Sequence, residues 1–456
     1  MGRPGCPDFA FSTASMLNVR RVLMQRRSKS CEGCMPTPAG SGGCRVQLMV
    51  THAIQPSRDW GPFPRVRSRE LSPGSRRRMV WKRNAEEKTM CRHLIVLPLA
   101  LVAMALLAPP LAAGEATRTV RLELSADRNG PFAVENLAGT MRISAGPGNK
   151  VVAVATLHAE SEALAEGMRL QQVIGEKGLP TLRVEYPLAE HESLRYRPND
   201  SEGEHHGILE NFFGGTSSLK YAGRSVKVSG NSGVFMYADL EVQLPARPVQ
   251  GTFRNLVGRI TAAGVRGTLL FDSASGNIDL DRVKGTIKAD TGSGDVKATG
   301  LEGTFRCDTG SGNCNLTGFQ GDELSCDVGS GNIRLKSLQA RLLSADTGSG
   351  NVRVEDANLE NFKADTGSGD VLLESVGPRL VKIKADTGSG DVVLRLAPEA
   401  SFEALADQGS GDLRVGYKDA QPIHKGREVI GYRRGDSKIR IDVSTGSGNL
   451  DIRPAR

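Results

Sequence analysis

Residues 343–373 read LSADTGSGNVRVEDANLENFKADTGSGDVLL, and this stretch contains the same short unit twice. In each unit, alternating apolar residues stand on both sides of a turn that ends in Ser-Gly-Asp or Ser-Gly-Asn. The turn recurs with its glycine at Gly276, Gly294, Gly312, Gly331, Gly350, Gly369, Gly390, Gly411 and Gly448. The intervals are 18, 18, 19, 19, 19, 21, 21 and 37 residues, and a fixed period near 20 indicates a solenoid. We interpret the last interval as one repeat with an insertion at residues 416–438.

The alternation predicts two short strands in each repeat, which we call a rung. Before the turn, one apolar column is Ile287, Phe305, Leu324, Leu343, Phe362, Ile383 and Ala404. A column of small residues follows it: Ala289, Cys307, Cys326, Ala345, Ala364, Ala385 and Ala406. One rung cannot bury its apolar face alone, but rungs stacked at ~4.8 Å can. We predict an all-β, parallel, two-sheeted β-solenoid with rungs of ~19 residues and a strand-rich N-terminal cap region.

The turn residues allow a structural and two chemical interpretations. Two glycines suit positive φ angles, and Asp and Ser side chains can bond local backbone amides. Asp-Thr-Gly-Ser also occurs in aspartic proteases, but these need two carboxylates across a shared cleft, whereas rungs would stack them along one edge. Two Asp columns could bind calcium, and we keep this as an open alternative. They are Asp290, Asp308, Asp327, Asp346, Asp365, Asp386 and Asp407, and Asp295, Asp370, Asp391 and Asp412, the latter shared with asparagines.

The cysteines fall into two groups. The first group precedes the repeats and comprises Cys6, Cys31, Cys34, Cys44 and Cys91. Cys31 and Cys34, with Cys44 and His52, faintly suggest a zinc site, but no second half with ligand spacing follows. Cys307, Cys314 and Cys326 stand at core positions, so we interpret them as small buried hydrophobic residues. Cys307 and Cys326 would point the same way from adjacent rungs, which suits a disulfide poorly.

The formal charge of +8 is concentrated at the front of the chain. Residues 1–92 hold 18 Lys and Arg against 6 Asp and Glu, and the remainder holds 41 against 45. The basicity therefore gives no reason to expect the repeats to bind nucleic acid. We interpret residues 1–89 as a disordered or mis-assigned upstream segment, because they are rich in Arg and Pro and lack periodicity.

Residues 90–114 have the plan of a secretory signal peptide: Arg92, an apolar run from Leu94 to about Leu107, and then prolines and small residues. The run is shorter than the ~20 residues that a membrane span needs, so no stable span is expected after cleavage. Translation that starts at Met79 or Met90 rather than Met1 would place this peptide at the beginning of the chain. The expected location is the periplasm, the cell surface or the extracellular space.

Residues 115–270 form a strand-rich N-terminal part of the repeat domain, and the Ser-Gly-Asp/Asn repeats occupy residues 271–456. A short helix is expected within residues 160–176. Residues 190–232 are polar and rich in Gly and Ser, and we expect a long surface loop there. His205 and His206 in this loop could contact a metal, but adjacent residues rarely converge on one ion, so we interpret them as solvated.

Three segments resemble a known family. They are the run Val134 to Gly139 with the following KVVAVA strand, the segment Leu240 to Pro245, and the Ser-Gly-Asp/Asn units up to Ile452. Together they are similar to the adhesin-labelled family of β-strand-repeat proteins called domain of unknown function 4097, over roughly residues 119–456. The resemblance implies an exported solenoid and supplies no catalytic residues.

Outward cations form two broken stripes, at Lys288, Arg306, Lys363 and Lys384 and at Lys297, Arg334, Arg353 and Arg414. Such stripes protect a flat sheet, and they also suit a repetitive anionic glycan. We predict an exported, non-catalytic, adhesin-like binding module of the envelope or surface, whose partner is a glycan or protein. We predict no catalytic, cofactor-binding or metal-binding residue. A polysaccharide-acting enzyme and an envelope accessory or signalling protein remain alternatives.

Overall fold

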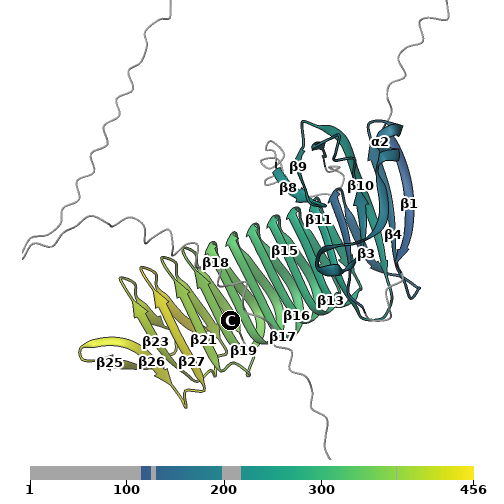
Figure 1. Cartoon of the computed structure of the whole chain (residues 1–456). Coiled ribbons are helices and arrows are strands. Elements are labelled where there is room, and N and C mark those ends of the chain that lie inside the picture. Colours follow the sequence, from purple (N-terminus) through teal and green to yellow (C-terminus); the bar gives the residue numbers. More distant parts are fainter. Residues whose placement is uncertain (1–114, 125–129, 198–216, 376, 456) are drawn as a thin grey trace, which may run out of the picture. The chain divides into compact units, whose positions relative to one another are not determined.

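The computed structural model describes residues 115–124, 130–197, 217–375 and 377–455. The upstream segment 1–89 and the signal peptide 90–114 lie outside the described residues. The all-β prediction is confirmed, because the described helices are only α2 (Glu162–Gly167) and the 3-10 turn η1 (Glu176–Gly178). Strands of successive rungs run side by side through the repeats (Figure 1).

The strands that precede each turn form one parallel ladder, which we call the before-turn ladder. Its spatial order begins with β2 and ends with β23. The strands are β2 (Phe132–Ala138), β11 (Val249–Val257), β13 (Arg266–Ser275), β15 (Lys284–Ser293), β16 (Val296–Ser311), β17 (Cys314–Ser330), β18 (Ile333–Ser349), β19 (Val352–Thr366), β21 (Lys382–Thr387), β27 (Ile439–Thr445) and β23 (Phe402–Gln408). Strands β16 to β19 are long because each continues from the end of one rung into the next.

The strands that follow each turn form a second parallel ladder, the after-turn ladder. The first residues of β16 to β19 make its middle part. The other strands are β3 (Met141–Ala145), β12 (Ile260–Ala263), β14 (Ile278–Asp281), β20 (Val371–Ser375), β22 (Val392–Leu396), β28 (Leu450–Pro454) and β24 (Leu413–Val415). Inward side chains of the two ladders meet in one continuous apolar core.

The predicted core columns are in register. Ile287 pairs with Phe305, and Phe305 pairs with Leu324, so the offset is 18 residues and then 19. Each of these side chains is at most 1% exposed. Burial of a Leu, Ile or Phe side chain contributes roughly 1.5–3 kcal/mol, so the columns are the main stabilising feature of the solenoid.

Turn glycines are needed for space rather than for positive φ angles, which corrects the sequence-based expectation. A Cβ atom on Gly294 would lie 2.2 Å from the carbonyl oxygen of Gly276 in the neighbouring rung. The same close approach recurs at Gly312, where the distance to the Gly294 oxygen is 2.0 Å. Any side chain there would push the stacked turns apart.

The last rungs do not stack in chain order. Strand β21 pairs with β27 of the C-terminal rung, and β27 in turn pairs with β23, although β23 comes earlier in the chain. The C-terminal rung carries large buried residues such as Ile441 and Ile452, whereas Leu413 and Val415 of the displaced rung are only partly buried. The C-terminal rung thus occupies the interior position, and Leu413 and Val415 lie at the end of the after-turn ladder.

The insertion at residues 416–438 contains two strands, β25 (Gln421–Lys425) and β26 (Glu428–Arg434), which pair antiparallel with each other. Strand β26 also pairs antiparallel with the first half of β23. It thereby covers part of an edge that would otherwise be open for pairing with another chain.

Strands from residues 116–244 extend both ladders beyond the rung made of β2 and β3. On the after-turn side, β10 (Val234–Leu244) pairs with β3 and with β4 (Val151–Ala159), and β4 pairs with β1 (Ala116–Leu124). On the before-turn side, β6 (Pro180–Glu185) pairs with β2 and with β5 (Arg169–Ile174).

Two expectations for this region are corrected. The helix predicted within residues 160–176 is limited to α2, because the residues that follow it form strand β5. The long loop predicted at residues 190–232 contains strands at both ends, while residues 198–216, with His205 and His206, lie outside the described residues. These strands are β7 (Ser193–Arg195), β8 (Ser217–Tyr221) and β9 (Arg224–Ser229). Val226 and Val228 are buried in β9. Because only these two apolar residues alternate with Ser and Lys, the pattern was too short to predict a strand.

Candidate binding site

The Asp and Asn residues that end the turns bond to neighbouring rungs rather than to local amides. The Oδ1 atom of Asp295 accepts a hydrogen bond from the backbone N–H of Asn313 at 2.7 Å. Equivalent bonds of 2.7–3.0 Å form a ladder through Asn277, Asp295, Asn313, Asn332, Asn351, Asp370, Asp391, Asn449 and Asp412. Only a carbonyl-type oxygen is needed, which explains why Asp and Asn interchange in the repeat.

The turn threonines are also used between rungs. The buried Thr309 hydroxyl donates to the Gly294 carbonyl of the adjacent rung at 3.1 Å. The same bond, at 2.9–3.1 Å, is made by Thr291, Thr347, Thr366 and Thr387. The polar atoms that first suggested catalysis or metal binding therefore join the rungs to one another.

The other Asp column is in register from Asp290 to Asp386, and Ser444 of the C-terminal rung then separates it from Asp407. Burial, followed by the Asp290 carboxylate, raises the pKa of Asp308 above its ordinary value. The Lys288 ammonium group partly compensates, at 2.5 Å from Asp290 and 3.9 Å from Asp308. Among the described residues, no group of three or more His, Cys, Asp or Glu side chains is arranged to hold a metal ion.

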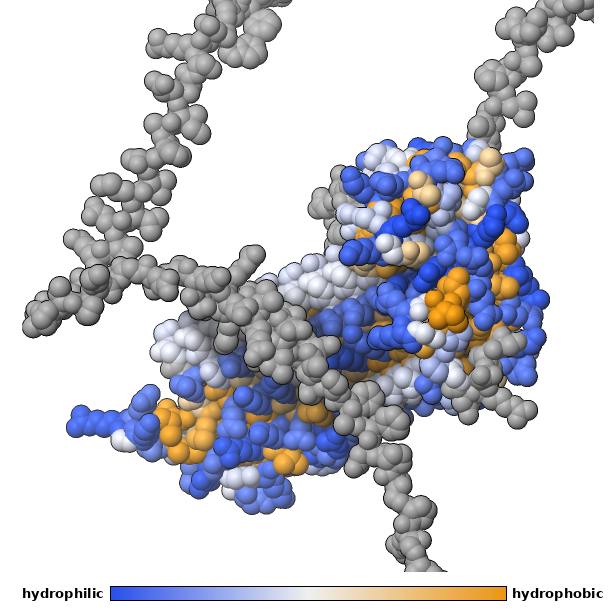
Figure 2. Space-filling view, viewed as in Figure 1, coloured by the Kyte–Doolittle hydropathy of each residue, from blue (hydrophilic) through white to orange (hydrophobic). Residues whose placement is uncertain are grey.

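The second predicted cation stripe is broken. Arg353 pairs with Glu355, and Arg414 pairs with Asp412 at 2.7 Å. In the register of this column, Leu372 and Val393 stand between these two arginines. Figure 2 shows hydrophobic residues among the hydrophilic ones on the face of the molecule turned toward the viewer.

A pocket of about 580 Å³ lies where the connection from β10 to β11 meets the first rungs. We call it the seam pocket. Its lining comes from segments far apart in the sequence: Gly130, Phe132, Val151, Pro245, Arg247, Pro248, Val249, Gln250, Arg266, Gly267, Thr268, Lys284, Gly285 and Thr286. Phe132, Val151, Pro245 and Val249 are buried and supply an apolar base, while the polar lining residues stand at its rim.

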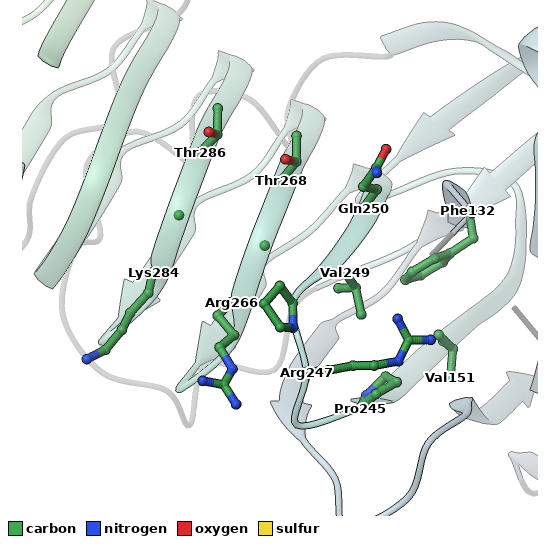
Figure 3. Close-up of a pocket in the computed structure, with 14 residues that line it drawn as sticks. Phe132, Val151, Pro245, Arg247, Val249, Gln250, Arg266, Thr268, Lys284 and Thr286 are labelled. Atoms are coloured by element: carbon green, nitrogen blue, oxygen red, sulfur yellow. The ribbon is translucent and has the colours of Figure 1, made fainter. Parts of the chain in front are cut away.

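The rim of the seam pocket carries positive charge and hydrogen-bond donors. Arg266 and Lys284 are register partners at the starts of neighbouring strands, and Thr268 and Thr286 are partners two residues further on (Figure 3). The Arg266 Nε donates to the Ala246 carbonyl at 2.6 Å, which fixes this guanidinium beside the connection. Lys284 pairs with Glu302 at 2.8 Å across two half-exposed side chains.

Glycines leave bare backbone between these side chains. Gly267 and Gly285 have φ angles of +143° and +121°, and a Cβ atom on either would lie about 2 Å from a carbonyl oxygen of the preceding rung. The pocket wall is therefore smooth at these positions, with Arg and Lys on one side and Thr on the other. Among the residues that the structure describes, the lining contains no Asp, Glu, His or Cys. Such a lining can hold an anionic group together with hydroxyl groups.

Sequence analysis did not find the seam pocket. Arg266 and Lys284 lie one period apart, but their column continues with Glu302, so no uniform cation stripe marks it. Arg247 lies in a connection with no periodic pattern. The feature of the sequence that indicates the seam pocket is the pair Pro245 and Pro248, because prolines interrupt regular strand structure between β10 and β11.

One histidine outside the pocket is held between carboxylates. His158 Nε2 lies 3.5 Å from Asp239 and its Nδ1 lies 2.9 Å from Glu115, and its ring stacks on Tyr237. The hydrogen bond with Asp239 raises the pKa of His158 above its ordinary value. Thr140 donates its backbone N–H and its hydroxyl to Asp239, so this cluster ties β4, β10 and the turn before β3 together.

Several solved structures are similar to this chain at low identity. A putative cell adhesion protein from Clostridium sporogenes is 12% identical, with 75% of this chain and 100% of that chain covered and a TM-score of 0.16. A putative lipid binding protein from Parabacteroides distasonis is 12% identical over 74% and 96%, with a TM-score of 0.32. A putative adhesin from Bacteroides fragilis is 9% identical over 74% and 97%, with a TM-score of 0.25. Scores this small carry no argument about function.

No curated protein matches the chain. A family model does match, over residues 285–453, and its description is Toastrack DUF4097. These residues run from β15 to β28 and contain the stacked turns with their Asx and Thr hydrogen bonds. The repeats of this chain therefore belong to the Toastrack family, domain of unknown function 4097, as the sequence resemblance predicted.

Proposed function

We propose that this protein is an exported, non-catalytic binding module of the cell envelope or surface, and that its seam pocket binds an anionic glycan. The observation that supports the proposal is the described lining of the pocket, in which Arg247, Arg266 and Lys284 occur without a carboxylate residue. Export rests on the signal peptide proposed at residues 90–114, with residues 1–89 upstream of it. No helix in the described part of the chain is long and apolar enough to cross a membrane.

The lining favours binding over polysaccharide cleavage. Most glycoside hydrolases use two carboxyl groups that flank the scissile bond, one as the acid and the other as the base or nucleophile. The described lining of the seam pocket offers neither group. The Asp columns elsewhere stack along one direction, and their members repel or bond to adjacent rungs instead of facing each other across a groove.

The chemistry of the rim indicates the class of ligand. Arginine and lysine bind carboxylate, sulfate or phosphate groups through charge-assisted hydrogen bonds. The exposed side chains of Gln250, Thr268 and Thr286 can bond sugar hydroxyls. Arg266 and Lys284 lie on neighbouring strands, at ~4.8 Å strand spacing, so this rim suits a glycan that presents anionic groups beside hydroxyl groups.

Binding of purified full-length protein to three polymers tests the proposal. Polygalacturonate and dextran sulfate carry anionic groups, and unmodified dextran serves as the uncharged control. We expect both anionic polymers to bind. The double variant Arg266→Gln/Lys284→Gln should lower affinity about tenfold or more, because hydrogen bonds to charged groups contribute roughly 1.5–3 kcal/mol each.

A matched control separates a site from general electrostatic attraction. The double variant Lys363→Gln/Lys384→Gln removes the same charge from the outer face of the same ladder, away from the seam pocket. Its affinity for the anionic polymers should stay within twofold of that of the unmodified protein, because solvent-exposed charges contribute little interaction energy. The proposal fails if neither anionic polymer binds, or if both double variants lose affinity equally.

A further inference from the structure

Three cysteine side chains meet in the core of the solenoid. Cys307 and Cys326 are register partners in the before-turn ladder, and Cys314 begins β17 in the after-turn ladder. Each is at most 1% exposed. The Cys314 thiol donates a hydrogen bond to Cys326 Sγ at 3.4 Å, so these two sulfur atoms are in contact across the core.

The three sulfur atoms are not equivalent. Burial raises the pKa of Cys307 well above its ordinary value, which keeps that thiol protonated. Hydrogen bonds from Cys307 and Cys314 lower the pKa of Cys326. In the folded core, the Cys326 thiol is therefore the one of the three that most readily loses its proton.

The contact geometry favours the pair Cys314 and Cys326. Cys307 and Cys326 extend in the same direction from adjacent parallel strands, at ~4.8 Å strand spacing, while a disulfide needs Cβ atoms about 3.5–4.5 Å apart that point toward each other. Cys314 and Cys326 come from opposite ladders and already touch through their sulfur atoms. Closing this contact to a covalent bond needs a movement of about 1.4 Å between the sulfur atoms.

We propose that Cys314 and Cys326 form a disulfide that ties the two ladders together across the core, and that Cys307 remains a free thiol. The inference rests on the proposed export, since disulfides form and persist in oxidising compartments. The oxidant is a disulfide, either of a thiol oxidoreductase or of oxidised glutathione. Because the folded core is closed to such a partner, the reaction belongs to folding, before these rungs stack.

The exchange balances in two steps. The thiolate of Cys314 or of Cys326, formed by loss of a proton to solvent, attacks the oxidant disulfide, forms a mixed disulfide and releases one thiol of the oxidant. The other sulfur of the pair, after losing its proton to solvent, attacks the cysteine sulfur of the mixed disulfide and releases the second thiol. The protein loses two protons and two electrons, and the oxidant disulfide is reduced to two thiols.

One tryptic peptide reports the result, because no Lys or Arg lies between Cys307 and Arg334. Reduced full-length protein is refolded with oxidised and reduced glutathione. Free thiols are blocked with iodoacetamide in denaturant, and the remaining disulfides are reduced and labelled with N-ethylmaleimide. Before reduction, we expect the peptide to be lighter by two hydrogens and to carry one iodoacetamide group, on Cys307. After reduction, the maleimide groups should be on Cys314 and Cys326.

Three iodoacetamide groups on this peptide, a pair that includes Cys307, or a link to a cysteine outside the peptide would overturn the proposal. The variant Cys307→Ser should still form the disulfide, whereas Cys326→Ser should leave both remaining thiols free. The melting temperature should rise on oxidation of the unmodified protein and of Cys307→Ser, but not of Cys326→Ser. Glycan binding takes no part in these measurements, so the failure of either proposal can be recognised separately.

Discussion

Exchange of one turn threonine for valine tests whether hydrogen bonds between rungs stabilise the solenoid. Thr309 is 1% exposed, and its hydroxyl donates to the Gly294 carbonyl at 3.1 Å. Valine has nearly the same shape but cannot donate. The next rung supplies a natural counterpart, because Val328 occupies the position that pairs with Thr309. The Gly312 carbonyl therefore receives no threonine hydroxyl from that rung.

The expected magnitude follows from two opposing contributions. Loss of the donor leaves a buried acceptor unsatisfied, which costs about 1–3 kcal/mol. The added methyl group gains about 0.8 kcal/mol of apolar burial. Thr309→Val should therefore destabilise the protein by about 0.2–2.2 kcal/mol. Val328→Thr exchanges the methyl gain for a hydrogen bond of about 0.5–1.5 kcal/mol, so its effect should lie within about 1 kcal/mol of zero.

Urea unfolding followed by circular dichroism measures both variants. The midpoints can be compared if the dependence of unfolding free energy on urea is unchanged. Stabilisation by Thr309→Val of about 0.8 kcal/mol would show that only methyl burial matters, and it would refute the reasoning. A loss of about 2 kcal/mol or more in Val328→Thr would show that the new hydroxyl is buried without a partner.

Three further changes probe the charged groups and the C-terminal order. The hydrogen bond with Asp239 raises the pKa of His158. Protonated His158 therefore stabilises the folded protein below about pH 6.5, and this stabilisation is lost as the pH rises through the pKa of the folded state. His158→Gln should flatten urea midpoints measured across this window, and an unchanged slope would contradict the assignment. The raised pKa of Asp308 means that its carboxylate costs stability at neutral pH, a cost that disappears in acid. Asp308→Asn should raise the free energy of unfolding at pH 7 by less than about 1 kcal/mol, and a lower free energy of unfolding would count against repulsion in the column. Removal of residues 439–456 should expose residues 402–434 to proteases, and mass spectrometry of the fragments would show the cleavage sites. Complete resistance of residues 402–434 to proteases would instead mean that β23 can pair directly with β21.

The repeated rungs were predictable because two independent periods agree. Alternation of apolar residues assigns the inward face, and the turn spacing fixes which residues pair. A slip of one residue would expose a whole column, so the pairing of Ile287 with Phe305 has no close competitor. The sequence therefore specified the register of most rungs without knowledge of the structure.

The Ser-Gly-Asp/Asn pattern does not identify the rungs at the N-terminal end, because an asparagine there donates the hydrogen bond that a turn threonine donates in the repeats. In β2 and β11, buried Asn136 and Asn255 replace the turn threonine. The Asn255 amide donates to the Gly139 carbonyl at 2.7 Å, which is the bond that Thr makes in the repeats. The shared signal is a glycine three residues after the donor, at Gly139 and Gly258.

The order of the last rungs could not be predicted, because the repeats are nearly interchangeable. Ile441 and Ala404 fit the same column, so local pairing does not determine which rung follows Ile383. The observed order places the hairpin of β25 and β26 beside the last rung, where β26 pairs with β23. This order appears only when the rungs compete for one position.

Hydrogen bonds within the repeat also determine where recognition can occur. The Asx oxygens and turn hydroxyls already bond to adjacent rungs, so a ligand that used them would compete with the contacts that hold the turns together. Groups that remain available stand where the repeat is interrupted. At the seam pocket, Pro245 and Pro248 replace a regular connection, and cations from two rungs border an apolar base. The regular part of the sequence thus specifies the scaffold, while the residues that break its period are the ones expected to bind.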